Sequence, residues 1–273
     1  MEGAETAMKE ISQNQKNYIL RLKRRKNHIT YARIIIAAVF FLLWQVCSDF
    51  GIIDPFIFSS PRAIILCAAD MIKKSSLLYH TAVTSAETTA GFLLSTFIGT
   101  AIAVILWWNS FLNDVFEPYL VMLNSIPKTA LAPIIIVWVG NNISSIITVA
   151  LLTSVIVSIL NILSAFNETD KDMIKLIYTL GGNKKDVLFK VILPANVPAI
   201  MNTLKVNTGL SFIGTIIGEM LVAKCGLGYL IIYGSQIFRL DMVLLSVVIL
   251  ALLSTVFYKI ILILENKIGA KMK

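Results

Sequence analysis

Charged side chains are scarce in this sequence. Asp, Glu, Lys and Arg make up only 15% of its 273 residues, whereas hydrophobic residues make up 57%. A soluble domain carries about 25% charged residues. The shortage of charge therefore excludes an ordinary water-soluble domain and favours a protein embedded in a membrane.

Residues and motifs for metal, disulfide, nucleotide or catalytic chemistry are missing too. Cys47, Cys67 and Cys225 are widely separated and show no CxxC or Cys/His spacing. His28 and His80 are isolated. No GxxxxGKS/T, HExxH, GxSxG or intramembrane paired-carboxylate motif occurs. We therefore predict that this chain has no metal site, no bound cofactor and no enzymatic activity.

Long uncharged runs are what the sequence has in abundance. Runs of about 17–25 apolar residues are long enough to cross a bilayer as helices. We predict an all-α integral membrane protein with six transmembrane helices, at residues 33–50, 87–108, 126–140, 143–166, 199–223 and 242–264.

The basic residues beside these runs predict the orientation of the chain. They gather in residues 1–32, in the polar segment 168–193 and in the C-terminal tail. Basic residues favour the cytoplasmic side of a membrane. We therefore predict an N-in/C-in topology, with 1–32 a basic cytoplasmic arm and 33–273 a single transmembrane domain. The net charge of +8 comes without a nucleic-acid motif, so we expect no nucleic-acid partner.

The polar segment 168–193, which we call the island, is expected to form a helix–loop–helix. Glu168-Thr169-Asp170 can supply the N-cap oxygens and negative charge for the start of the first helix, and Gly181-Gly182 can adopt the left-handed conformation that ends it. Asn183 can cap a second helix, which we expect Pro194 to end. Each helix has one apolar face, made of Met173, Ile174, Leu176, Ile177 and Leu180 in the first and Val187, Leu188, Val191 and Ile192 in the second. Such a pair can dock into a groove of a soluble partner or lie on the membrane surface, and its residues alone fit both.

The spacing of the island resembles the coupling loop of binding-protein-dependent ABC importer permeases. That loop reads Glu-Ala-Ala, three residues, Gly, and later Ile/Val-x-Leu-Pro. The matching residues here are Leu180-Gly181, Val191-Ile-Leu-Pro194 and Pro198. At the Glu-Ala-Ala positions this chain departs from the family and has Lys175, Leu176 and Ile177.

Further motifs, from residue 59 to the end of the sixth span, resemble the permeases grouped with nitrate, sulfonate and taurine importers. Each is weak alone, and their order and spacing carry the resemblance. In chain order they are Ser59-Ser-Pro61, residues 79–85 with 89–92, residues 125–133, Trp138-Val-Gly140, Gly218-Glu219 and Gly226-Leu-Gly228.

The resemblance implies the permease subunit of a type I ABC importer in the bacterial cytoplasmic (inner) membrane. Its partners would be a separate ABC ATPase that binds ATP-Mg, an extracytoplasmic solute-binding protein and a second copy of this chain. The solute would be a small anion such as a sulfonate or nitrate. A vitamin precursor remains an alternative solute, and a stand-alone channel or secondary carrier an alternative function. The residues expected to couple to the ATPase are Lys175, Leu176, Ile177, Leu180, Gly181, Gly182, Asp186, Phe189 and Pro194.

Glu219 lies late in the fifth predicted span, where a carboxylate is costly unless it faces water, a partner or a cavity. We place Glu219, Gly214 and Gly218 on the translocation path or its gate. For Glu219, a buried hydrogen bond that holds the 226–228 loop and exposure at the membrane interface remain alternatives. Gly214 and Gly218 let helices approach closely, and the resemblance implies that they line the two-fold interface of a homodimer.

Overall fold

The computed structural model describes residues 13–271 of the protein, and no strand occurs among them. The predicted all-α fold is therefore confirmed for this part of the chain. The chain divides into two compact units, residues 1–63 and 64–273, which are described separately.

The first unit is built around α2 (Gln13–Asp49), followed by the single turn of α3 (Pro55–Phe58). Helix α2 is continuous, so it contains both the predicted first span and the second half of the predicted basic arm. The first twelve residues of that arm lie outside the described residues. Asp54 accepts a hydrogen bond from the backbone N–H of Phe56 and caps α3, as short polar side chains commonly do at helix starts.

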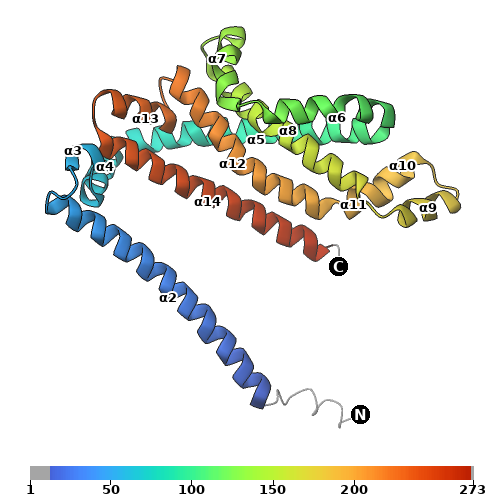
Figure 1. Ribbon diagram of the computed structural model, residues 1–273, viewed down its shortest axis with the longest axis horizontal. Helices are drawn as coiled ribbons and strands as arrows, with labels where there is room; N and C mark the ends of the chain where they lie inside the picture. The colour runs from blue at the N-terminus through green and yellow to red at the C-terminus, as the bar shows by residue number, and fades with distance from the viewer. Residues whose placement is uncertain (1–12, 272–273) are drawn as a thin grey trace. The chain divides into compact units, whose positions relative to one another are not determined.

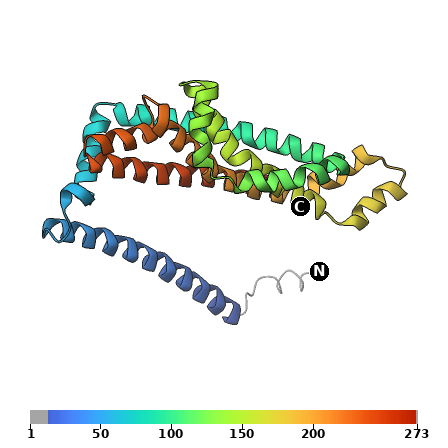
Figure 2. The ribbon, with the colours of Figure 1, turned by 45° about the horizontal axis from the view of Figure 1, so that its top comes forward.

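The long helices α5, α8, α12 and α14 run along the length of the second unit, and α7 stands across it, as Figures 1 and 2 show. Helix α8 packs against both α5 and α12, and α12 also contacts α13 and α14. The helices are α4 (Pro61–Lys73), α5 (Ser76–Trp108), α6 (Ser110–Ser125), α7 (Lys128–Val139), α8 (Ile143–Asn167), α9 (Lys171–Thr179), α10 (Lys184–Val187), the π-turn η1 (Leu188–Ile192), α11 (Leu193–Ala195), α12 (Val197–Val222), α13 (Leu227–Gln236) and α14 (Leu240–Lys271).

Four described helices are long and apolar enough to cross a membrane. The number of spans rises to as many as six if each of two bent helix pairs counts as one span. Three of the four, α5, α8 and α14, match the second, fourth and sixth predicted spans, although α5 begins eleven residues earlier, at Ser76. The predicted third span at 126–140 coincides with α7, which counts toward a crossing only together with α6. Helix α7 has only 12 residues, about 18 Å, and it joins α6 at an angle of 99°.

Small residues bring the three central helices together. A Cβ atom added at Gly91 of α5 would lie 2.6 Å from the Cβ of Ala150 on α8. From the other side, a Cβ atom at Gly214 of α12 would lie 2.6 Å from the Cα of that same Ala150. Close helix approach through small residues is typical of membrane proteins, because it maximises van der Waals contact where no hydrophobic effect drives association.

We expect Gly214→Ala to lower the stability of the detergent-solubilised protein by about 1–3 kcal/mol, the usual cost of overpacking. The added methyl group meets the backbone of α8, which cannot rotate away as a side chain can. Gly209→Ala is the matched control, because that glycine lies on the same helix with nothing within 4 Å of an added Cβ. Denaturation by heat or SDS would measure the difference. Equal stability of the two variants would contradict this packing.

Polar side chains add hydrogen bonds between the same three helices. The amide nitrogen of Asn207 on α12 donates to Ser158 Oγ on α8 at 2.6 Å and to Thr96 Oγ1 on α5 at 3.3 Å. The Oγ atoms of Ser154 and Ser211 lie 3.3 Å apart, joining α8 to α12 a second time. The position of α12 is therefore fixed by packing and by polar contacts.

Candidate functional site: the island and the 226–228 loop

The island projects from one end of the second unit, and α13 lies at the opposite end (Figures 1 and 2). The Asp170 side chain accepts from the backbone N–H of Asp172 at 2.8 Å and caps α9. Gly181 has a φ of +81° and ends the helix, because glycine takes the left-handed conformation without steric cost. Both features were predicted from the sequence.

The second island helix begins with a capping box. The Asn183 side chain accepts from the backbone N–H of Asp186 at 3.1 Å, and the Asp186 carboxylate accepts from that of Asn183 at 3.0 Å. The predicted apolar face of this helix, Val187, Leu188, Val191 and Ile192, is buried in the core. A reciprocal cap of this kind satisfies backbone donors that the first helical turn leaves unpaired.

The prediction that Pro194 ends this helix is wrong. The helix continues to Ala195 through the π-turn at 188–192, in which the Leu193 N–H donates to the Leu188 carbonyl. Proline has no N–H to donate and its ring clashes with the preceding turn, and the wider π-turn just before Pro194 accommodates it. The chain then bends by 59° at Asn196, between α11 and α12.

Several apolar side chains of the island are exposed, and we call them its outward face. Leu180, Phe189 and Leu176 expose 75%, 65% and 57% of their surfaces, and Met173 is also exposed. Ile177, by contrast, is half-buried and packs against the core. The predicted coupling residues are therefore split between an exposed apolar set and a set that supports the loop.

Charged residues of the island pair locally. Lys175 lies 3.1 Å from Asp172, and Lys190 lies 2.7 Å from Asp186. Lys184 connects the island to the end of α5: its Nζ donates to the Trp108 carbonyl at 2.7 Å and lies over the indole rings of Trp107 and Trp108. The second glycine of the loop, Gly182, packs directly on Ile177, leaving no room for a side chain.

At the far end from the island, Glu219 holds the loop between α12 and α13. Only 1% of its surface is exposed. Its Oε1 accepts from Thr84 Oγ1 of α5 at 2.6 Å, and its Oε2 accepts from the backbone N–H of Gly228 at 2.5 Å. Of the roles considered for Glu219, these hydrogen bonds match that of an anchor for the 226–228 loop, and its place on the translocation path stays a prediction.

Two further hydrogen bonds attach α5 to this loop. The backbone N–H of Leu227 donates to Thr84 Oγ1 at 2.8 Å, and that of Gly226 donates to His80 Nδ1 at 2.9 Å. The His80 ring also stacks on Tyr229. We call Thr84, Glu219 and His80, together with residues 226–228, the loop lock. His80 therefore has a structural role that its isolation in the sequence did not reveal.

Glu87 was missed in the sequence because it marks the edge of the predicted second span. It is 5% exposed, and its carboxyl group interacts with that of Glu219. Its Oε2 atom is buried without a hydrogen-bond partner. The carboxyl groups of Glu87 and Glu219 thus form a pair inside the helix bundle, although no local sequence motif predicts it. No group of three or more His, Cys, Asp or Glu residues suited to a metal ion occurs in the described part of the chain.

Gly214 and Gly218 lie against α8 of their own chain. Added Cβ atoms would meet the backbone of α8 at Ala150 and at Ile146. The small-residue spacing of Gly214 and Gly218 therefore serves the close packing of α12 on α8. Their predicted place on the translocation path or at a two-fold interface stays a prediction.

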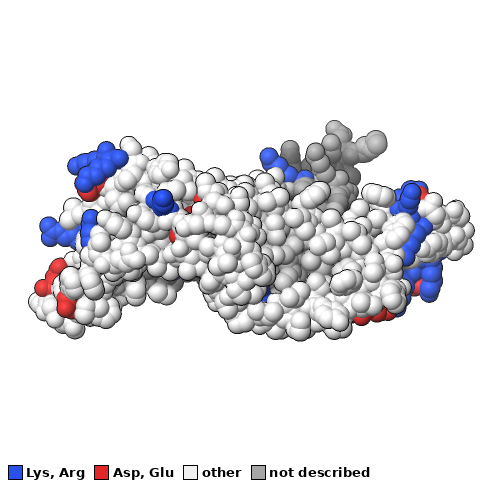
Figure 3. Space-filling model, turned by 90° about the horizontal axis from the view of Figure 1, so that it is seen from above, with Lys and Arg blue, Asp and Glu red and all other residues white. Residues whose placement is uncertain are grey.

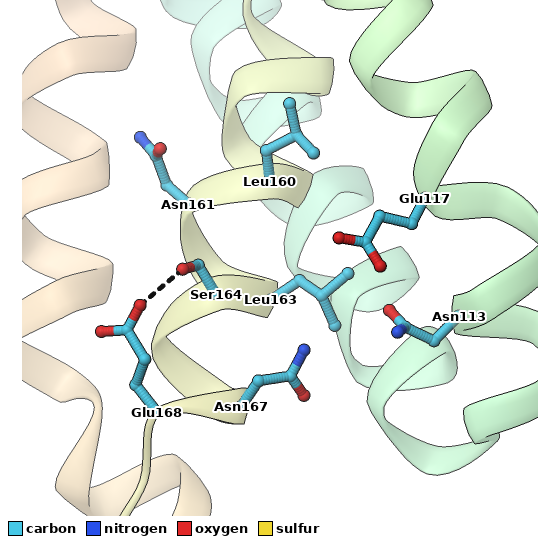
Figure 4. A pocket seen from close by; sticks show the side chains of 8 residues that line it. All are labelled: Asn113, Glu117, Leu160, Asn161, Leu163, Ser164, Asn167 and Glu168. Atoms are coloured by element: carbon cyan, nitrogen blue, oxygen red, sulfur yellow. Dashed lines mark hydrogen bonds between the residues drawn. The ribbon is translucent and has the colours of Figure 1, made fainter.

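Two cavities with polar groups in their walls lie in the described part of the second unit. The island-side cavity, of about 460 Å³, lies between α6 and α8 (Figure 4), and its polar lining is Asn113, Glu117, Asn161, Ser164, Asn167 and Glu168. The loop-side cavity, of about 300 Å³, has the polar lining Glu87, Asn141, Asn142, Lys224 and Cys225. Pockets of 300–1,000 Å³ are typical of small-molecule sites.

Charged side chains are sparse on the surface seen from above. In the view of Figure 3, most of the visible surface carries neither basic nor acidic side chains, and the charged groups gather toward the two ends. This distribution fits an apolar belt that faces lipid, with charged residues near the membrane surfaces.

Comparison with known proteins agrees with this geometry. Residues 93–271 match the family described as binding-protein-dependent transport system inner membrane component. The formylaminopyrimidine transport permease protein ThiX of Halalkalibacterium halodurans is 29% identical, over 69% of this chain and 74% of its own. A Bacillus subtilis protein described as an aliphatic sulfonates transport permease, SsuC, is 25% identical over 89% of this chain and 88% of its own.

The fold also matches a solved structure, that of the MetNI methionine ABC transporter in an inward-facing conformation. The TM-score is 0.56 at 18% identity, and the match covers 69% of this chain and 96% of that one. The matched family model spans more than half of the chain. The chain therefore belongs to the family of binding-protein-dependent transport system inner membrane components.

Proposed function

We propose that this multi-pass ABC importer permease subunit receives the work of a separate ATPase through the outward face of its island. The exposed side chains of Leu176, Leu180 and Phe189 carry this proposal. Large apolar side chains exposed on a protein surface mark a contact site when they form a patch, and a short amphipathic helix pair fits a hydrophobic groove of a soluble partner. The island would then lie on the cytoplasmic side, and the binding protein would meet the loop end.

The connections of the island suit it to pass on a movement. Its second helix is buried against the core on one face and continues into α12 after the bend at Asn196. Lys184 ties it to the end of α5. A push by the ATPase would therefore reach α5 and α12 together, in a rigid-body change between two states of the pore. A second copy of the chain would complete that pore.

The solute is a small molecule that the binding protein delivers. The relatives named above are described as carrying formylaminopyrimidine and aliphatic sulfonates, so both a small anion such as a sulfonate or nitrate and a vitamin precursor are consistent with them. A stand-alone channel or secondary carrier would need no ATPase, and this difference separates the two kinds of protein experimentally.

Affinity purification of the tagged protein from membranes in mild detergent tests the proposal. We expect a P-loop ATPase to co-purify at near-equal stoichiometry and to be lost when residues 175–190 are deleted. Gly209→Ala is the control: it is expressed and purified in the same way as the deletion variant, and it should retain the ATPase. A homo-oligomer without an ATPase that still moves solute in liposomes would overturn the proposal in favour of a channel or carrier.

A further inference from the structure

The N-terminal half of α2 has a cluster of basic residues without a counter-charge. Residues 21–26, which we call the collar, include Arg21, Lys23, Arg24, Arg25 and Lys26. The sequence has no Asp or Glu between Glu10 and Asp49. The three arginines are exposed, and none of them belongs to an ion pair among the described residues. The rest of the helix, up to Asp49, therefore offers these arginines no counter-charge.

The length of α2 places the collar relative to a bilayer. The helix is continuous from the collar to Asp49, and at 1.5 Å per residue the collar lies about 35–42 Å from Asp49 along the axis. The hydrocarbon core of a bilayer is about 30 Å thick, and the whole bilayer with its headgroups about 40–45 Å. With Asp49 at one edge of the hydrocarbon core, the collar therefore falls in the headgroup layer of the opposite surface or just outside it. An ordinary helix tilt of about 20° moves it slightly inward.

The residues that follow the collar agree with this depth. Tyr31 exposes 61% of its surface and lies about 27 Å from Asp49 along the helix, near the edge of the hydrocarbon core, where tyrosine is enriched. Arg33 lies about 24 Å from Asp49, and a side chain of its length can reach back to the headgroups. The uncharged run at residues 34–48 then lies within the hydrocarbon core.

The collar positions also surround the helix. At about 100° per residue, positions 21, 24 and 25 share one side of α2, whereas positions 23 and 26 fall on the other. A helix that docks into a protein groove presents one face to it. Lipid headgroups, by contrast, can approach a membrane-spanning helix from every side. The distribution of basic positions therefore favours lipid over a soluble protein as the partner.

We propose that the collar binds the phosphate groups of anionic phospholipids such as phosphatidylglycerol. Clusters of about four to eight basic residues next to a membrane-spanning helix are typical of anionic-lipid sites, and each such residue strengthens the attraction roughly fivefold. Arginine suits this ligand, because its guanidinium group can donate two parallel N–H bonds to one phosphate. In the predicted N-in topology these lipids belong to the cytoplasmic leaflet. The proposal concerns the first unit and does not depend on the function proposed for the island.

Native mass spectrometry of the full-length protein in detergent tests this proposal, because it counts bound lipids during a titration. The probes are phosphatidylglycerol and the zwitterionic phosphatidylcholine. We expect the wild-type protein to bind phosphatidylglycerol more tightly than phosphatidylcholine. The triple variant Arg21→Gln, Arg24→Gln, Arg25→Gln should weaken phosphatidylglycerol binding by about tenfold or more and leave phosphatidylcholine binding unchanged. All three side chains are exposed, so the fold should tolerate the change.

Two control variants separate the collar from net charge and from folding. The variant Lys73→Gln, Lys171→Gln, Lys185→Gln removes the same charge at exposed positions outside the collar, and it should leave phosphatidylglycerol binding nearly unchanged. Replacement of the three collar arginines by lysine keeps the charge and should retain most of the binding. Equal weakening by the glutamine variants at the two places would overturn the proposal, as would equal binding of the two lipids by the wild-type protein.

Two further outcomes identify other ligands. Glycerol 3-phosphate has a phosphate group without acyl chains, and binding as tight as that of phosphatidylglycerol would overturn the proposal in favour of a site for free phosphate groups. Loss of the co-purifying ATPase from the collar variant, with lipid binding intact, would show that the collar contacts a protein instead. A wild-type protein that binds phosphatidylglycerol through the collar but co-purifies with no ATPase would refute the proposed function and leave this proposal intact.

Discussion

Replacement of Gly226 by alanine should destabilise the detergent-solubilised protein by about 3 kcal/mol. Two effects add. Gly226 has a φ of +108°, a conformation that costs a residue with a side chain about 1–3 kcal/mol. An added Cβ would also lie 2.5 Å from both carboxylate oxygens of Glu219, so the carboxyl group must leave Thr84 and Gly228. The loss of buried hydrogen-bond partners adds about 1–3 kcal/mol.

Gly181→Ala is the control for this experiment. Gly181 has a similarly positive φ of +81°, but nothing lies within 4 Å of an added Cβ. It should therefore show the backbone strain alone, a loss of about 1 kcal/mol. Thermal or SDS denaturation of both variants measures the two effects. If Gly226→Ala is no less stable than Gly181→Ala, Glu219 does not hold the loop as described.

Introducing a charge on the outward face of the island should abolish coupling without unfolding the protein. We expect the double variant Leu180→Asp, Phe189→Asp to reduce ATPase co-purification at least tenfold. Both side chains are largely exposed, so the substitutions leave the core intact, and surface substitutions usually change stability by less than about 0.5 kcal/mol. In a docked complex, however, each carboxylate would be buried in an apolar groove without a partner, which is strongly unfavourable.

Lys171→Ala is a matched variant on the same helix–loop–helix, at an exposed polar residue, and it should retain the ATPase. The measurement is the ratio of ATPase to permease after purification, together with a thermal melt of each variant. Full retention of the ATPase by the double aspartate variant would show that the partner docks elsewhere. A lowered melting temperature for that variant would show that Leu180 and Phe189 support the fold.

Local rules were sufficient to predict much of the island. Asp170, Gly181 and Asn183 each act through backbone groups within three residues, so a short stretch of sequence contains all the atoms involved. Pro194 was predicted wrongly because the π-turn that accommodates it depends on the core packing of residues 188–192. The same limit explains α5: its first eleven residues include polar side chains that lower hydropathy, although they are helical.

The sequence by itself determined that the chain is a helical membrane protein, that a capped polar island interrupts its apolar spans, and which family it resembles. These properties depend on composition, on periodicity and on neighbours a few residues apart. Only the tertiary structure decided that Glu219 anchors a loop beside Glu87, that Gly214 packs on α8, and that Glu117 lines a polar cavity. Each of these roles depends on atoms from helices distant in the chain. Inside a membrane, a polar group that loses its protein partner cannot form a hydrogen bond to water instead, so such contacts are strongly stabilising.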